Sequence, residues 1–269
     1  MEPLVDDLGR AVELAAPPRR IVSLVPSLTE TLFAIGAGPC VVAVTRYCEE
    51  PAADVARLPK VGGTKNPDLQ AIVELAPDVV VMNAEENRRE DFDALAAAGV
   101  TVFVTEPKTM FDGVRSIAQL AELTGCAEGT ALAADQDRRV RATLAQVEGR
   151  PPVRYFCPIW RKPWMTFNAD TYAHDMLRAA GGANVCAVAA ERYPTVTLEA
   201  IAGAEPEVVL LPDEPYRFTE KDLAALEPLA LPRERVHFVD GKALSWYGPR
   251  IADGLARFAT LFASARVDC

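Results

Sequence analysis

The chain has 269 residues and a net charge of −10, and this acidity excludes a general affinity for nucleic acid. Half of the residues are hydrophobic, enough to bury one large core or two smaller ones. No apolar stretch reaches the roughly 18 residues of a membrane-spanning helix, and the acidic N-terminus lacks the pattern of a secretory signal. We therefore expect a cytoplasmic protein, or one whose leader has been removed.

Apolar runs alternate with amphipathic segments along the first 105 residues, and this alternation is typical of α/β folds with a parallel sheet. Each apolar run is bounded by Pro, Gly or polar residues. The predicted strands are 20–25, 41–45, 79–82 and 101–105, and the predicted helices are 27–36, 69–76 and 88–98.

Residues 110–147 form a mostly helical stretch, and its second half, 128–147, is rich in Ala, Leu, Arg and Gln without any Pro. This composition predicts a long helix that joins two lobes stiffly. The expected domains are an N-terminal α/β lobe over 1–125, the connecting helix over 126–149 and a C-terminal α/β lobe over 150–269. In the C-terminal lobe we expect strands at 153–157, near 185, at 208–211 and at 235–239, and helices at 172–180, near 198, at 220–226 and at 250–264.

One sequence pattern occurs twice. The segment Asp68–Met82 recurs as Thr197–Leu211, and Pro77 and Pro206 occupy the same place in the two copies. Each copy reads as a short helix, a Pro that ends it, an acidic residue and a buried strand. Two lobes of similar design predict a cleft between them, where a ligand is most often held.

Enzymatic signatures are poor, because the sequence contains none of the common nucleophile, zinc-protease or phosphate-binding motifs. The only histidines are His174 and His237, and their positions favour structural roles. The six cysteines form no CxxC pair and are expected to be free thiols. We therefore predict no catalytic residue, no metal site and no catalytic cofactor, and hence a binding protein rather than an enzyme.

Aromatic and cationic side chains gather at the predicted ends of strands, where ligands of open α/β sheets sit. Their number favours a large, flat, partly apolar ligand, with cations that grip its polar rim. The candidate ligand-binding residues are Arg46, Tyr47, Lys65, Trp160, Trp164, Tyr193, Trp246 and Tyr247.

The opening segment 20–36 resembles that of the vitamin B12 and ferric-siderophore binding proteins of ABC importers, the helical-backbone metal receptors. Four further segments fit the same family, and the resemblance runs from about Asp6 to Ser264. These segments are 69–81, 170–184, 193–211 and 246–255. The resemblance implies two Rossmann-like lobes joined by one helix, a cleft that holds the ligand, an extracytoplasmic location and an ABC permease as partner. We also expect the protein to be a monomer.

Within the family the chain is most similar to the branch that binds B12, a cobalt corrinoid. The resemblance implies that Tyr47, Tyr193, Trp164 and Trp246 pack on the corrin ring. The loop 63–66 departs from that branch, since it lacks the Trp often found there, and Asn83 stands where an aromatic residue is common.

The family also docks on its permease through one carboxylate in each lobe. Glu199 matches in the second lobe, whereas Gln70 takes the equivalent place in the first. These departures leave two alternatives. One is a ferric-siderophore or heme binding protein of the same fold, and the other is a cytosolic corrinoid- or chelate-binding protein, or an enzyme, outside transport.

Overall fold

A computed structural model describes residues 4–267 of the chain. The chain divides into two compact units, each built on a four-stranded sheet. The first unit comprises the residues up to Pro107 together with Phe111–Asp137 and Tyr247–Pro249, and the second comprises Lys108–Met110, Arg138–Trp246 and the residues from Arg250 onward. The predicted α/β class, with parallel sheets in two lobes, is confirmed.

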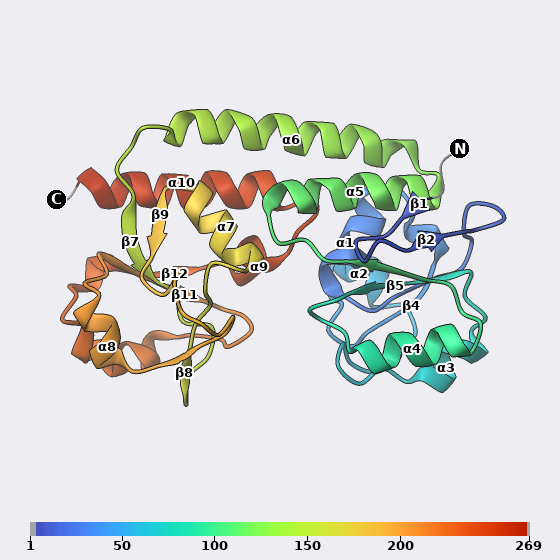
Figure 1. Ribbon diagram of the computed structural model, residues 1–269, viewed down its shortest axis with the longest axis horizontal. Helices are drawn as coiled ribbons and strands as arrows, with labels where there is room; N and C mark the ends of the chain where they lie inside the picture. The colour runs from blue at the N-terminus through green and yellow to red at the C-terminus, as the bar shows by residue number, and fades with distance from the viewer. Residues whose placement is uncertain (1–3, 268–269) are drawn as a thin grey trace. The chain divides into compact units, whose positions relative to one another are not determined.

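The first unit has strand order β4-β3-β5-β6, with all neighbours parallel. Ile72 and Leu95, from α3 and α4, pack on one face of this sheet, and Figure 1 shows α1 and α5 on the other face. The elements are β3 (Ile21–Ser23), α1 (Pro26–Ala34), η1 (Gly38–Cys40), β4 (Val41–Val44), α2 (Ala52–Val55), α3 (Leu69–Glu74), β5 (Val79–Asn83), α4 (Arg89–Ala97), β6 (Val102–Thr105) and α5 (Met110–Thr124).

The second unit has strand order β12-β11-β7-β9, again parallel throughout. Read in chain order, the first strand of each sheet lies between the second and the third, so both sheets share one topology. Helix α6 (Ala127–Val147) begins in the first unit and ends in the second. The other elements are β7 (Val153–Phe156), β8 (Trp164–Met165), α7 (Tyr172–Ala179), β9 (Gly182–Asn184), β10 (Thr195–Val196), α8 (Leu198–Gly203), β11 (Val208–Pro212), η2 (Glu220–Leu229), η3 (Arg233–Arg235), β12 (Val236–Val239), α9 (Gly241–Ser245) and α10 (Ile251–Val267).

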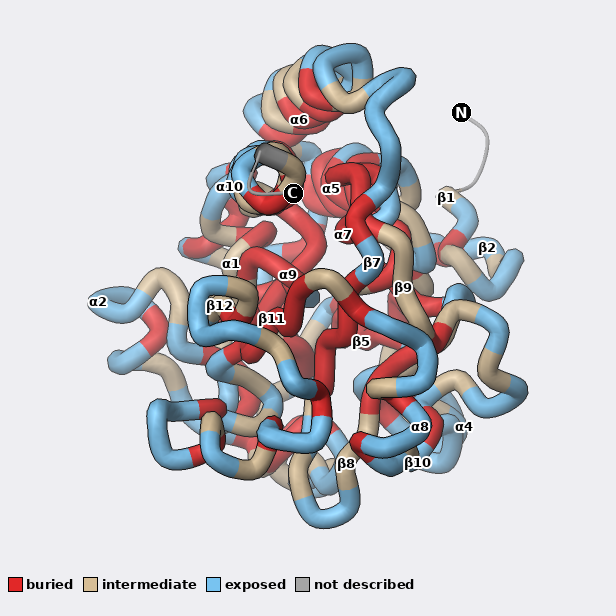
Figure 2. Tube along the Cα trace, turned by 90° about the vertical axis from the view of Figure 1, so that its left-hand side faces the viewer, coloured by how far each residue is buried: buried red, intermediate tan, exposed pale blue. Residues whose placement is uncertain are grey.

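The sequence repeat becomes the third strand of each sheet and the helix before it. β5 and β11 are buried along their whole length (Figure 2). The helices begin alike, because the side chains of Asp68 and Thr197 each accept a hydrogen bond from a backbone N–H of the first turn. They also end alike, since Ala76 and Glu205 both adopt left-handed backbone, with φ of 43° and 49°, immediately before the repeated Pro.

A second contact is also duplicated, at the start of the first strand of each sheet. The Arg20 guanidinium donates to the backbone carbonyl that follows α3, and the Asp78 carboxylate accepts from the Arg20 backbone N–H at 2.9 Å. In the other unit, Arg154 donates to a carbonyl just beyond α8, and the Glu207 carboxylate accepts from its backbone N–H at 2.7 Å. The carbonyl that the arginine reaches belongs to the helix cap, Leu75, in the first unit and to Glu205, one residue past the cap, in the second.

An N-terminal hairpin, β1 (Leu4–Val5) and β2 (Ala11–Val12), was not predicted from the sequence. The Asp7 backbone N–H donates to the Val104 carbonyl of β6, and the buried Asp6 carboxylate accepts from the Val104 N–H at 3.4 Å. The Asp7 carboxylate accepts from the Glu106 N–H at 2.7 Å. The hairpin therefore occupies backbone groups along the outer edge of the first sheet.

The predicted helical stretch 110–147 is interrupted once. Gly125, with a φ of 71°, separates α5 from α6, and a glycine at this position is typical of a helix end. The predicted helix near residue 220 is a 3₁₀ helix that contains Pro228. No helix among residues 4–267 has both the length and the apolar character needed to span a bilayer.

Candidate ligand-binding site

In the first unit, Arg46 and Tyr47 follow β4 directly and lie together at the carboxyl end of the sheet. Tyr47 is 56% exposed, and the Arg46 guanidinium lies 5.4 Å from the centre of its ring. Arg46 also donates to the Asn66 side-chain oxygen at 3.2 Å. Gly63 makes this packing possible, because a Cβ there would lie 3.1 Å from the Tyr47 ring and 2.9 Å from the Arg46 guanidinium.

Asn83, which stands where an aromatic residue is common, is buried and holds the end of β5. Its side-chain oxygen accepts from the backbone N–H groups of Glu85 and Glu86, both at 2.9 Å, and its amide donates to the Thr105 carbonyl at 3.0 Å. The Asn87 side chain accepts from the Asn83 backbone N–H at 2.9 Å. The asparagine therefore shapes the loop and offers no flat surface to a ligand.

Lys65 is exposed, and its Nζ donates to the Glu85 carbonyl of that same loop. The Asn87 amide donates to the Thr64 carbonyl at 2.9 Å, so two loops are joined by neighbouring contacts. Lys65 thus lies between Gly63 and Asn66, the two residues that contact Arg46, and is bound to the loop after β5.

In the second unit, Trp160 and Trp164 belong to a hairpin that follows β7. The Trp160 and Met165 backbones pair, and β8 in turn pairs with β10, so that Trp164 lies opposite Val196. Trp160 is 43% exposed. Tyr193 is 37% exposed and comes two residues before β10, so the hairpin and the segment that carries Tyr193 are held side by side.

Two aromatic residues that the sequence analysis did not select pack against this hairpin. The Tyr216 ring meets the Trp160 ring edge-on, with 5.6 Å between centres, and the Phe218 ring is stacked with the Trp164 ring at 5.9 Å. Both follow β11, so their position at a strand end was the signal that could have found them. Neither is part of a repeated motif.

Trp246 and Tyr247 are adjacent in sequence but fall in different units, and both are buried. Cations flank the Trp246 ring, with Lys242 Nζ 5.0 Å and the Arg250 guanidinium 5.6 Å from its centre. The Tyr247 hydroxyl lies 3.3 Å from the Thr105 hydroxyl, and burial raises the pKa of Tyr247. Their roles in ligand binding remain predictions.

Glu199 and Gln70, the positions predicted to dock on a permease, are exposed at the starts of equivalent helices. Glu199 lies in the first turn of α8. Gln70 lies in the first turn of α3, and its amide donates at 2.8 Å to the carboxylate of Glu74 one turn further along. A carboxylate is therefore still displayed on α3, from Glu74.

Titratable side chains are scattered rather than gathered. No three His, Cys, Asp or Glu residues within 4–267 are grouped so that they could hold a metal ion. Five described cysteines are free, and burial raises the pKa of the Cys157 and Cys48 thiols. The sixth, Cys269, lies outside the described residues. A raised pKa disfavours the reactive thiolate form of Cys157 and Cys48.

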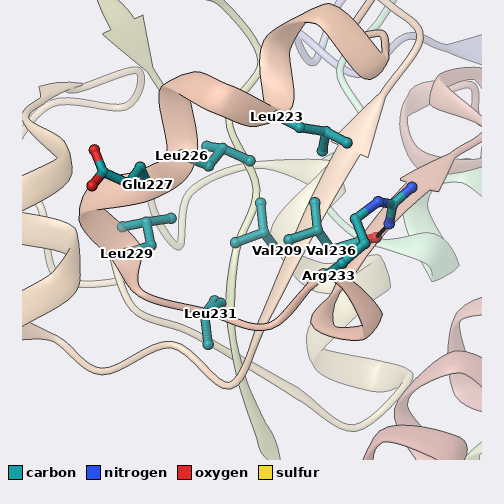
Figure 3. Close-up of a pocket in the computed structure, with 8 residues that line it drawn as sticks. All are labelled: Val209, Leu223, Leu226, Glu227, Leu229, Leu231, Arg233 and Val236. Atoms are coloured by element: carbon teal, nitrogen blue, oxygen red, sulfur yellow. Dashed lines mark hydrogen bonds between the residues drawn. The ribbon is translucent and has the colours of Figure 1, made fainter.

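A pocket of about 200 Å³ lies beneath η2 in the second unit (Figure 3). Six aliphatic side chains, Glu227 and Arg233 line it, and it contains none of the predicted ligand-binding residues. Pockets for ligands of drug size usually exceed about 300 Å³, so this one is too small for a macrocycle. The aliphatic residues are Val209, Leu223, Leu226, Leu229, Leu231 and Val236.

Comparison with known proteins gives consistent results. The family model described as periplasmic binding protein matches residues 21–225. A vitamin B12-binding protein of Vibrio cholerae is 25% identical over 91% of this chain and 89% of its own, and a cobalamin-binding protein of Halobacterium salinarum is 28% identical over 96% of this chain and 73% of its own.

Solved structures share the fold. The periplasmic vitamin B12 binding protein of Vibrio cholerae is similar with a TM-score of 0.83 at 24% identity, over 93% of this chain and 98% of the other. A periplasmic heme-binding protein in complex with two hemes has a TM-score of 0.81 at 27% identity, over 91% of this chain and 98% of the other.

Proposed function

Because the chain belongs to the periplasmic binding protein family, we propose that it is the corrinoid-binding component of an ABC importer. It captures a cobalamin-like ligand outside the cytoplasm and delivers that ligand to a permease. No catalytic step is part of this function. The curated relatives named for vitamin B12 and cobalamin support the choice of ligand.

The observation that carries this proposal is the set of exposed aromatic rings at strand ends in both units. Tyr47 in the first unit, and Trp160 and Tyr193 in the second, are each more than a third exposed, although such rings are usually buried. A corrin is a wide, flat macrocycle with amides along its rim. Rings supply its apolar contacts, and the exposed cations Arg46 and Lys65 supply hydrogen bonds to the amide oxygens.

The test is an isothermal titration of the purified protein with cyanocobalamin, with hemin as the comparison ligand. We expect saturable one-to-one binding of cyanocobalamin, micromolar or tighter, accompanied by a shift of its visible bands. Binding of hemin alone would replace the corrinoid by a porphyrin with acidic side chains. Binding of neither would overturn the proposal and favour a ferric siderophore or a role outside transport.

We further propose that Glu199 docks on the permease, with Glu74 taking the part that Gln70 cannot play. A carboxylate on an exposed helix can form charge-assisted hydrogen bonds with arginines of a partner. In proteoliposomes that contain the permease, Glu199→Gln should slow ligand uptake, Glu74→Gln should slow it further, and Gln70→Glu should raise it. Unchanged uptake in all three would remove both helices from the docking surface.

A further inference from the structure

An aromatic pair, Trp160 and Tyr216, lies on the second unit at the carboxyl end of its sheet. Trp160 follows β7 and Tyr216 follows β11, and these two strands are neighbours in the sheet. The rings meet at an interplanar angle of 73°, the edge-to-face arrangement that aromatic pairs favour. Trp160 is 43% exposed and Tyr216 is half-buried, so the pair presents ring surface to a ligand.

A buried aromatic floor supports the pair. Phe218, which is 4% exposed, lies 4.6 Å from the Tyr216 ring, measured between centres. The Phe218 ring is also stacked almost parallel to the Trp164 ring, with an interplanar angle of 3°. Tyr216 therefore packs against two rings, Trp160 and Phe218, and both contacts would be lost if its side chain turned away.

The carboxylate of Asp222 holds Tyr216 in place by a hydrogen bond to its hydroxyl. Asp222 is buried, and its carboxylate accepts hydrogen bonds from the Tyr216 hydroxyl at 3.3 Å and from the Arg161 guanidinium. It also accepts the backbone N–H and the hydroxyl of Thr219, at 2.8 and 3.1 Å. Asp222 thus ties the loop after β7, the loop after β11 and the start of η2 to one point.

This arrangement is more than is needed to cap a short helix. Thr219 alone completes the capping of η2 with Asp222, whereas the contacts to Arg161 and Tyr216 join two separate loops. Holding a contact group in its bound orientation before the ligand arrives lowers the entropy that binding must offset. The carboxylate is therefore placed to preorganise the aromatic pair.

We propose that Tyr216 is a ligand-contacting residue of the corrinoid site and that Asp222 is the positioning residue that holds Tyr216 against Trp160. This inference rests on the proposed function, because it assigns a further part of the same ligand site. The ring pair would bear on the apolar face of the macrocycle, and the Tyr216 hydroxyl would stay with Asp222.

The first test is cyanocobalamin titration of variants. Tyr216→Leu should weaken binding about tenfold, as loss of an aromatic contact at an interface does, whereas Tyr216→Phe keeps the ring and should weaken it about twofold. Asp222→Asn should weaken binding about threefold and shift the tryptophan emission before any ligand is added. Two matched control variants should bind cyanocobalamin as the wild type does. Phe238→Leu, the control for Tyr216→Leu, removes another exposed ring of the same unit. Asp240→Asn, the control for Asp222→Asn, alters the N-terminal cap of α9.

The second test uses the wild-type protein, so that it holds even if a variant fails to fold. Hydroxyl-radical footprinting read by mass spectrometry should show that cyanocobalamin protects Trp160 and Tyr216 but leaves Phe238 unprotected. If the wild type binds, and Tyr216→Leu binds equally well or Tyr216 is not protected, the inference fails and the proposed function stands. If the wild type does not bind cyanocobalamin, both fail together.

Discussion

The two units of this chain share a framework and differ in their strand-end loops. Both sheets have the same strand order, and both repeats carry the same helix cap, left-handed residue and arginine contact. The loops diverge. The first unit closes its strand ends with compact polar contacts around Asn83, whereas the second extends a tryptophan hairpin and the ring of Tyr216. The parts that pack in the core are therefore alike in the two units, whereas the loops at the strand ends, where a ligand would bind, differ.

The largest expected effect tests whether the two frameworks are energetically equivalent. Ile72 in α3 and Ile201 in α8 stand at the same repeat position, and both are buried in core clusters. Replacing either by Ala should cost about 2–5 kcal/mol, because a cavity remains. Urea unfolding read by circular dichroism should show both losses.

Tryptophan emission adds a unit-specific measurement, since Trp160, Trp164 and Trp246 all belong to the second unit. The loss of stability that tryptophan emission reports for Ile201→Ala should be at least as large as the loss that circular dichroism reports. Val73→Ala, at an exposed position of α3, should cost less than about 0.5 kcal/mol. Loss of stability in only one isoleucine variant would contradict the equivalence.

The next effect concerns the loops rather than the framework. A Cβ at Gly63 would crowd Asn66, Arg46 and Tyr47, and every atom it meets belongs to a side chain that can move. Gly63→Ala should therefore change stability by less than about 1 kcal/mol but displace Tyr47 and weaken cyanocobalamin binding about tenfold. Calorimetry checks both quantities. Gly203→Ala meets no atom within 4 Å and should leave binding unchanged. Unaltered affinity in Gly63→Ala would exclude Tyr47 from the site.

Lowering the pH should destabilise the second unit more than the first, because both histidines lie in the second unit. Burial, with neighbouring arginines, lowers the pKa of His174 and of His237 below the ordinary 6.5. The unfolded chain then binds more protons than the folded chain, so stability is complete above pH 6.5 and falls as the pH drops through that value. The urea concentration at the unfolding midpoint, read by tryptophan emission, should decrease as the pH is lowered from about 7.5 to 5.5. The double variant His174→Gln, His237→Gln should not show this decrease. An equal fall in that double variant would assign the effect to other groups.

The smallest effect sharpens the comparison at the repeat itself. Ala76 and Glu205 hold left-handed backbone, which costs a residue with a Cβ about 1 kcal/mol. Ala76→Gly and Glu205→Gly should each stabilise the protein by about 0.5–1 kcal/mol, visible as a raised melting temperature. Ala98→Gly, where φ is an ordinary −79°, should not stabilise. A lowered melting temperature in both repeat variants would show that the entropy that Gly adds to the unfolded chain outweighs the removal of backbone strain in the folded chain.

Much of the framework could be predicted from the sequence because periodicity and helix stops are local signals. The repeat gave both α/β lobes, and Pro77 and Pro206 marked the same helix ends. The N-terminal hairpin was missed because Asp6 and Asp7 act through contacts with β6, about a hundred residues away. The pairing of β8 with β10 was missed for the same reason, since two-residue strands carry no periodicity.

The candidate site was less predictable. Position at strand ends found Tyr47 and Trp160, which are exposed, but it also selected Trp246 and Tyr247, which are buried. Whether a ring is presented or enclosed depends on its neighbours in space, such as Lys242 and Arg250 around Trp246. Tyr216 also follows a strand, β11, but it was overlooked because its contacts with Trp160 and Asp222 cannot be seen in the sequence.

The N-terminal hairpin has a consequence for self-association. An uncovered edge strand can recruit a strand from another molecule and so begin fibril growth. Asp6 accepts from the N–H of Val104 on β6, and Asp7 accepts from the N–H of Glu106, the residue that follows β6, so carboxylates lie where an incoming backbone carbonyl would have to bind. Polymerisation through this edge would first require the hairpin of residues 4–12 to detach, so the hairpin protects the edge of the first sheet from strand addition.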